Sequence, residues 1–257
     1  MIVDYHMHLR DPEERIDHTV EAVERFVAVA EERGVDEIGF TEHVYYFALT
    51  RPLWSVPYMF ERCVYDLDAY VDAVLEAKRR RLPVKLGLEI DYVGERQGEL
   101  AALLEPYPWD FLLGSVHWLG GAAVDMEPGV WAETSVEEVW TRYLSALAEL
   151  AASGHVDVLA HPDLAKIFGR RPERIQYPPL PAVALEISTA GLHKPVGELY
   201  PDPAMLAGRP PITLASDAHV PANVGRDFDR ALEHARAAGY ETVTVFDRRR
   251  GRQEPLG

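Results

Sequence analysis

Short β-branched segments alternate with longer segments of helical period along almost all of the 257 residues. Strands are expected at 1–6, 35–42, 84–91, 111–117, 156–161, 182–188, 211–218 and 242–246. The clearest helical periods cover 18–33, 66–81, 95–105, 135–153, 197–207 and 222–238. Such alternation predicts an α/β fold with parallel strands joined by helical crossovers. Because seven or eight such units fit this length, a closed barrel of the TIM type is favoured over an open sheet.

No Gly/Ser-rich linker, internal repeat or composition shift divides the sequence. We therefore expect a single domain over residues 1–247. The last ten residues, 248–257, begin with the basic run "RRRGR" and are expected to form a polar C-terminal tail.

Composition limits the possible partners. A formal net charge of −16 repels phosphate backbones and anionic lipids, so neither nucleic acid nor a membrane surface is an expected partner. The sequence shows no leader-like start and no apolar run of transmembrane length, which predicts a cytoplasmic protein. Cys63 is the only cysteine, so metal ligands must come from His, Asp and Glu.

Residue types that bind metal ions follow nearly every expected strand, where the functional residues of such barrels lie. In His6-x-His8 and Asp217-x-His219, two side chains share one side of an extended segment and can converge on one ion. The full series is His6, His8, Glu42, His43, Glu89, Asp91, His117, His161, Glu186, Asp217 and His219. Imidazole and carboxylate without thiolate suit Zn²⁺, Mn²⁺ or Fe²⁺.

Two hydrolase families resemble parts of this series. "HMHLRDP" is similar to the opening of dihydroorotase and other cyclic amidohydrolases, which bridge two ions with a carboxylated lysine. The four lysines are Lys78, Lys85, Lys166 and Lys194, and none ends a central strand. The amidohydrolase interpretation therefore lacks its bridging ligand.

The whole series resembles the polymerase-and-histidinol-phosphatase (PHP) family over residues 1–240. The motifs that carry the resemblance are "DYHMH", "GFTEH", "GLEIDY", "GSVHW", "AHPDL", "EIST" and "ASDAH". Within the family, "GLEIDY", "GSVHWL" and "AGLHKPVGELYPDP" look like the monofunctional histidinol-phosphate phosphatases of histidine biosynthesis. The resemblance implies a distorted (β/α)₇ barrel with three divalent metal ions, with the strand at 242–246 outside the barrel.

The family pattern also implies the ligands of each ion. The first ion takes His6, His8, Glu89 and Asp217, the second takes Glu89, His117 and His161, and the third takes His43 and His219. One further histidine normally comes from the loop after the opening motif. Glu14 stands at the expected spacing and His18 is the nearest histidine. His18 is the favoured candidate, because the loop can be longer in this chain.

The resemblance implies hydrolysis of L-histidinol phosphate to L-histidinol and phosphate. Two ions sharing Glu89 would lower the pKa of a bridging water and present hydroxide to phosphorus, with Asp217 holding one of them. The candidates for protonating the leaving group are Asp91, Glu42 and His193. The candidates for binding the substrate are Lys194, Arg170, Arg171 and Arg10 for phosphate, and Tyr45, Tyr46, Tyr92, Trp118 and Glu198 for the amine and imidazole.

Other members of the family provide alternatives: protein-tyrosine phosphatases, nucleases or phosphodiesterases, and non-catalytic modules of DNA polymerases. A nearly complete ligand series argues against a non-catalytic module. A nuclease would need a basic, aromatic-lined channel, which a net charge of −16 does not indicate. Histidinol phosphatase is therefore the leading prediction.

Overall fold

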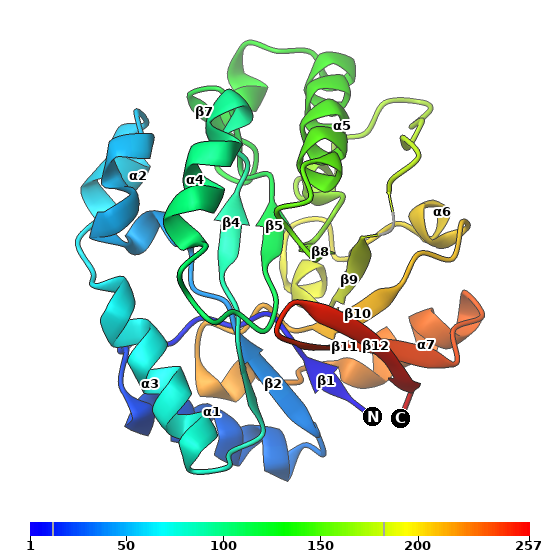
Figure 1. Ribbon diagram of the computed structural model, residues 1–257. Coiled ribbons are helices and arrows are strands. Elements are labelled where there is room, and N and C mark those ends of the chain that lie inside the picture. The colour runs from blue at the N-terminus through cyan, green and yellow to red at the C-terminus, as the bar shows by residue number, and fades with distance from the viewer. Residues whose placement is uncertain (12, 182) are drawn as a thin grey trace.

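The computed structural model describes residues 1–11, 13–181 and 183–257, and places strands at its centre with helices around them (Figure 1). All strands of the two main sheets run parallel, in the orders β1-β2-β3 and β10-β9-β8-β5-β4. The strands of the described chain are β1 Val3–Asp4, β2 Glu37–Phe40, β3 Val84–Leu86, β4 Glu89–Asp91, β5 Leu113–Ser115, β6 Trp118–Leu119, β7 Ala122–Ala123, β8 Val158–Leu159, β9 Ala184–Ser188, β10 Ile212–Ala215, β11 Thr242–Asp247 and β12 Arg250–Pro255.

The two main sheets close into one barrel through backbone hydrogen bonds at two seams. At the first seam, the Tyr5 N–H donates to the Leu214 carbonyl (3.0 Å), which joins β1 to β10. At the second, the Glu89 N–H donates to the Glu42 carbonyl (3.0 Å). Because β3 and β4 are two parts of one interrupted strand, the ring has seven strand positions. The predicted distorted (β/α)₇ barrel is confirmed.

Helices form where the sequence provides an apolar stripe and an N-terminal cap. The Thr19 side chain accepts a hydrogen bond from the Ala22 N–H at the start of α1, and Ser135 caps α5 in the same way. Apolar faces of both helices are buried against the strands. The α-helices of the described chain are α1 Val20–Glu32, α2 Pro57–Arg62, α3 Leu67–Arg79, α4 Gln97–Leu104, α5 Val136–Ala152, α6 Pro203–Leu206 and α7 Phe228–Ala237. None is long and apolar enough to cross a membrane.

Two helices are shorter than the periodicity predicts. In the expected helix 197–207, only α6 is helical, because the Lys166 ammonium donates to the Leu199 carbonyl (2.7 Å) and holds the preceding chain in a loop. In the expected helix 222–238, Asp227 has a φ of +56°, a left-handed conformation that stops helix α7 from extending further back. Local periodicity could not reveal either constraint.

The expected C-terminal tail over 248–257 instead includes a strand. Strand β12 pairs antiparallel with β11, and the turn between them is fixed to the barrel. The Arg249 N–H donates to the Asp110 carbonyl (2.7 Å), and its guanidinium binds Asp157 (2.8 Å). In Figure 1 this hairpin crosses the front of the molecule near the two termini. Strand β11 joins neither main sheet, as the resemblance implies.

Aromatic rings fill the end of the barrel beside this hairpin. Tyr5 stacks on Phe111 with 4.9 Å between ring centroids, and Phe111 stacks on Phe246 of β11 at 5.7 Å. A Cβ atom on Gly39 would lie 2.6 Å from the Phe111 ring, so glycine makes room for this ring. These large apolar side chains stabilise the end of the barrel opposite the strands' carboxyl termini.

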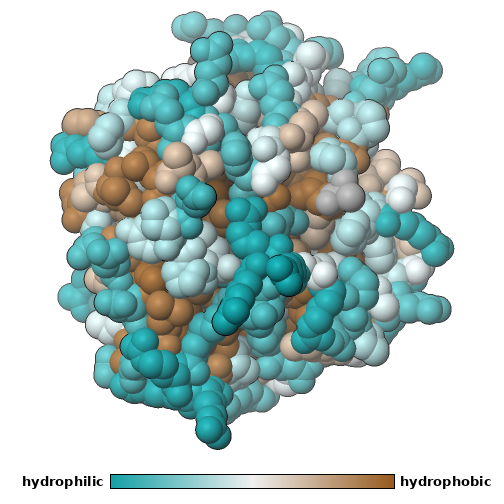
Figure 2. Space-filling model, viewed as in Figure 1, coloured by the Kyte–Doolittle hydropathy of each residue, from teal (hydrophilic) through white to brown (hydrophobic). Residues whose placement is uncertain are grey.

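The outer surface is mostly hydrophilic on the face in Figure 2, with hydrophobic side chains in separate patches.

Asp4 provides a test of barrel closure. Its buried carboxylate accepts hydrogen bonds from the Ser216 N–H (2.9 Å), the Ser216 hydroxyl (2.6 Å) and the Gly225 N–H (2.8 Å), which tie β1 to the chain after β10. We expect Asp4→Ala to lower the free energy of unfolding by about 2–4 kcal/mol, because these donors lose their acceptor. Urea denaturation measures this. Asp36→Ala, which removes one exposed bond to the Ile2 N–H, is the control; equal losses would contradict the prediction.

Candidate metal centre

Histidine and carboxylate side chains from six strand ends meet at the carboxyl end of the barrel. Four sets of three have ligand atoms within 4.8 Å of one another. The sets are His8, His43 and His219; His6, Glu89 and His161; His6, His8 and Asp217; and His43, Asp91 and His117. Together they include every ligand predicted from the sequence except His18, and they add Asp91.

Glu89, at the start of β4, occupies the middle of these sets. Its Oε1 atom lies 3.3 Å from Nε2 of His161 and 3.5 Å from Nε2 of His117. Its Oε2 atom lies 3.5 Å from Nε2 of His6 and 2.6 Å from Nδ1 of His43. Each carboxylate oxygen therefore faces a different group of imidazoles, as a carboxylate shared by two ions requires.

Many of these ligand atoms are buried without a hydrogen-bond partner among the described residues. They include Nε2 of His6, both ring nitrogens of His8, Nδ1 of His43, both carboxylate oxygens of Glu89 and Oδ2 of Asp91. An unpaired buried polar atom costs about 1–3 kcal/mol. A cluster of such atoms is stable when a cation binds them, and imidazole with carboxylate suits divalent transition metals. The residues present fit metal ions.

Two of these residues have unusual backbone conformations. His161 has a φ of +28° and Asp217 has a φ of +53°. Both values lie in the left-handed region, which residues other than glycine rarely adopt. Both follow barrel strands, β8 and β10 respectively. Backbone strain of this kind concentrates at functional sites, where it aims a side chain that regular strand geometry would direct elsewhere.

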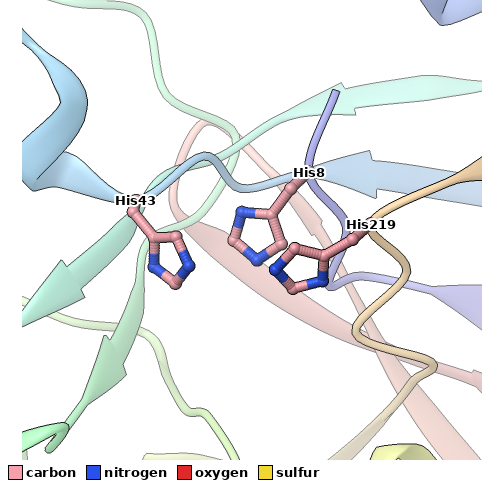
Figure 3. A group of neighbouring side chains, drawn as sticks. All are labelled: His8, His43 and His219. Atoms are coloured by element: carbon pink, nitrogen blue, oxygen red, sulfur yellow. The ribbon is translucent and has the colours of Figure 1, made fainter. Parts of the chain in front are cut away.

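Figure 3 shows His43 and His219, two ligands predicted for the third ion, together with His8, which was predicted for the first. The ring centroids of His8 and His43 lie 4.2 Å apart and those of His8 and His219 lie 4.3 Å apart, and one ligand atom from each of the three lies within 4.8 Å of the others. His18 lies outside this group, with its Nε2 atom 3.5 Å from Oε1 of Glu42. Glu14 is exposed, with a φ of +64°. The choice of His18 as the completing ligand stays a prediction.

The buried charges stabilise one another. Burial alone would raise the pKa of Glu89, but His43, His6 and His117 lower it well below the usual value. Burial would lower the pKa of His6, yet Glu186, Glu89 and Asp217 raise it well above its usual value. Burial likewise opposes protonation of His117, but Glu89 and Asp91 raise its pKa to about 10. Without metal, Glu89 is ionised and these two imidazoles hold protons at neutral pH.

The candidate proton donors have different surroundings. Oδ1 of Asp91 lies 2.8 Å from Nδ1 of His117, which places Asp91 inside the cluster. Glu42 is fully buried, and its Oε1 atom accepts from the Leu9 N–H (2.7 Å) and the Arg10 guanidinium (2.8 Å). His193 is exposed and lies 2.6 Å from Asp227, outside the four sets.

The candidate phosphate-binding cations are dispersed. Arg10 is buried, paired with Glu42, and lies 5.2 Å from the centroid of the Tyr46 ring. Arg170 pairs with Glu127 (2.5 Å), and Lys194 lies in an exposed segment. Both partners of Arg10 reach the cluster, because Oε2 of Glu42 lies 3.6 Å from Nδ1 of His8 and the Tyr46 ring packs against His43.

The candidates for contacting the amine and imidazole also separate. Tyr45 stacks on His43 with 4.8 Å between centroids, and Tyr46 packs edge-on against the same ring at 5.3 Å. The ring centroid of Trp118 lies 5.5 Å from that of Tyr58, a residue that the sequence analysis did not name. Two others are bound elsewhere: the Tyr92 hydroxyl donates to Glu149, and Glu198 pairs with Arg171. Aromatic rings thus form one wall beside His43.

Glu186 belongs to the predicted series of metal-binding residue types, but the sequence analysis assigned it to no ion. It lies within β9, is fully buried, and contacts His6 (2.8 Å). The signal was available, because a carboxylate within an otherwise apolar strand is costly unless a partner or an ion compensates for it.

A family model, the PHP domain, matches residues 4–190. This match covers more than half of the chain and spans β1 to β9, the part that carries most of the cluster.

The chain belongs to the PHP family.

Similar proteins agree with this assignment. A probable histidinol-phosphatase of Deinococcus radiodurans is 30% identical over 247 residues, covering 90% of this chain and 93% of that protein. A histidinol-phosphatase of Lactococcus lactis is 24% identical, covering 95% and 94%. The crystal structure of histidinol phosphate phosphatase from Lactococcus lactis, complexed with Zn, L-histidinol and phosphate, has a TM-score of 0.71 at 19% identity and covers 98% of each chain. That structure shares the fold of this PHP protein.

The raised pKa values predict that metal binding to the PHP cluster releases protons. His117, whose pKa is raised to about 10, and His6, whose pKa is raised well above its usual value, hold protons in the metal-free protein. A metal ion must displace those protons, so affinity should rise with pH until about 10, where His117 loses its proton unaided. Calorimetric titration in buffers of different ionisation enthalpy should show release of about two protons at pH 7. Binding heats that do not depend on the buffer would contradict this.

Proposed function

We propose that this PHP protein is a metal-dependent phosphomonoesterase that converts L-histidinol phosphate to L-histidinol and phosphate. The observation that carries the proposal is the set of buried ligand atoms around Glu89 that have no hydrogen-bond partner among the described residues. The substrate comes from similarity to two histidinol-phosphatases over at least 90% of this chain. The catalytic unit would be the single domain whose barrel strands run from β1 to β10.

Three divalent ions, Zn²⁺, Fe²⁺ or Mn²⁺, would bind to the strand ends. His6, His8, Glu89 and Asp217 would hold the first, Glu89, His117 and His161 the second, and His43, His219 and His18 the third. Metal ions in such a site make hydroxide available at neutral pH and neutralise the charge of a phosphate ester. His18 suits its place because its Nε2 atom is buried without a hydrogen-bond partner among the described residues.

The protein's own groups would bind and orient the ester. Glu42 holds the Arg10 guanidinium at the edge of the cluster, where its positive charge can face phosphate oxygens. The ring wall of Tyr45 and Tyr46 beside His43 can pack against an imidazole and limit access of water. Asp91 is the candidate for moving a proton to the leaving oxygen, since it lies with His43 and His117 in one set.

The substrate is tested by measuring phosphate release from L-histidinol phosphate, phosphotyrosine and short oligonucleotides. We expect kcat/KM to be highest for L-histidinol phosphate, and we expect dialysis against a chelator to abolish the activity until metal is restored. Comparable rates on all three substrates would remove the substrate assignment. Activity that survives complete metal removal would remove the mechanism.

The third ion's ligands are tested by counting metal per chain after dialysis. We expect His18→Ala to retain about one ion fewer than the wild type, because it removes one proposed ligand of the third ion. Glu14→Ala should retain full metal, because Glu14 is exposed. Full metal content in His18→Ala would show that the third ion binds without this residue.

A further inference from the structure

Glu186 places a fully buried carboxylate in the middle of the strand "ALEIS", β9. Its neighbours Leu185 and Ile187 are also fully buried. Both of its oxygens have partners from other strand ends. Oε2 lies 2.8 Å from Nδ1 of His6, and Oε1 accepts a hydrogen bond from the backbone N–H of His161 (3.2 Å).

We propose that Glu186 is a positioning residue that holds His6 and His161 in the orientation needed to bind metal at the first and second ion sites. The inference rests on the proposed metal centre. In this proposal Glu186 binds neither ion itself, but it orients one ligand of each site: His6 in the first and His161 in the second.

The contact with His6 determines which ring nitrogen is free. A carboxylate beside Nδ1 favours the form in which Nδ1 carries the proton and donates it. Once a metal ion displaces the second ring proton, the free lone pair is on Nε2, and this atom lies 3.5 Å from Oε2 of Glu89 and 3.7 Å from Oδ1 of Asp217. Glu186 therefore fixes both the tautomer of His6 and the rotation of its ring.

The contact with His161 acts on the backbone. His161 has a φ of +28°, which is unfavourable for a residue with a side chain. Glu186 compensates by accepting its N–H, and the Tyr143 hydroxyl lies 3.4 Å from its carbonyl oxygen. In this conformation Nε2 of His161 lies 3.3 Å from Oε1 of Glu89.

Asp91 shows that the same arrangement occurs elsewhere in the cluster. Its Oδ1 atom lies 2.8 Å from Nδ1 of His117 and leaves Nε2 of His117 facing Oε1 of Glu89 at 3.5 Å. Asp91 orients one histidine, whereas Glu186 contacts two ligand residues from β1 and β8. The loss of Glu186 should therefore affect two ion sites together.

A glutamine cannot replace this carboxylate. Both oxygens of Glu186 face N–H groups, so an amide of the same size must turn its NH₂ toward one of these donors. Glu186→Gln thus preserves shape but breaks one of the two contacts. The matched control is Asp110→Asn, another buried carboxylate, which binds Lys78 (2.5 Å) and the Leu86 N–H (2.8 Å) away from the cluster.

The experiment titrates metal-free wild type, Glu186→Gln and Asp110→Asn with Co²⁺ against a chromophoric chelator and records the cobalt absorption spectrum. We expect Glu186→Gln to lower the Co²⁺ affinity of the first and second ion sites about 10- to 100-fold and to change their absorption spectrum. The site of His43 and His219 should keep its affinity, and Asp110→Asn should bind like the wild type. A general folding defect would instead weaken all sites.

Wild-type affinities and spectrum in Glu186→Gln would overturn the proposal, as would equal weakening of all three sites. If Glu186→Gln does not fold by circular dichroism, Glu186→Asp gives the same test, because its shorter side chain keeps the charge but cannot maintain both contacts. These readouts do not use hydrolysis. A wild-type protein that binds metal but does not hydrolyse L-histidinol phosphate would refute the substrate and leave the role of Glu186 standing.

Discussion

The burial of the Glu89 carboxylate is the constraint on which the rest of the site depends. A charged group without solvent exposure is stable only with opposite charge beside it, and Glu89 is surrounded by the imidazoles of His6, His43, His117 and His161. These rings come from four different strand ends, so barrel closure sets their distances. The same backbone bond that joins Glu89 to Glu42 closes one of the barrel's two seams. Fold and site are therefore fixed by a shared set of contacts.

Much of this could be predicted from the sequence, because the position of a strand end depends on a strong local signal. Each barrel strand is a short apolar segment, and His117 and His161 each follow such a segment closely. Parallel strands bring their carboxyl ends together whatever the connecting helices do. The residues of the cluster could therefore be predicted without knowing the loops. The sequence analysis could not assign a role to Glu186, because its position in a strand does not show that its two carboxylate oxygens face His6 and His161.

The features that sequence reasoning missed depend on contacts between distant segments. Arg249 and Asp157 are 92 positions apart, and their contact fixes the turn that makes 250–255 a strand rather than a tail. The Lys166 ammonium determines where α6 begins by binding the Leu199 carbonyl, 33 positions away. The loop that contains Glu14 and His18 carries no periodic pattern. In each case the local sequence permits several structures, and tertiary contacts select one.

The two ends of the barrel divide stability from chemistry. At one end, Tyr5, Phe111 and Phe246 form a buried aromatic stack that satisfies local preferences and packs closely. At the other, His161 and Asp217 adopt left-handed backbone conformations, and several buried polar atoms lack hydrogen-bond partners within the part of the chain that the structure describes. Local rules are broken where side chains must converge on an ion, and the well-packed end supplies the stability that tolerates this strain. Metal binding would then relieve the electrostatic cost in the place where it is concentrated, which couples the stability of the strand ends to occupancy of the site.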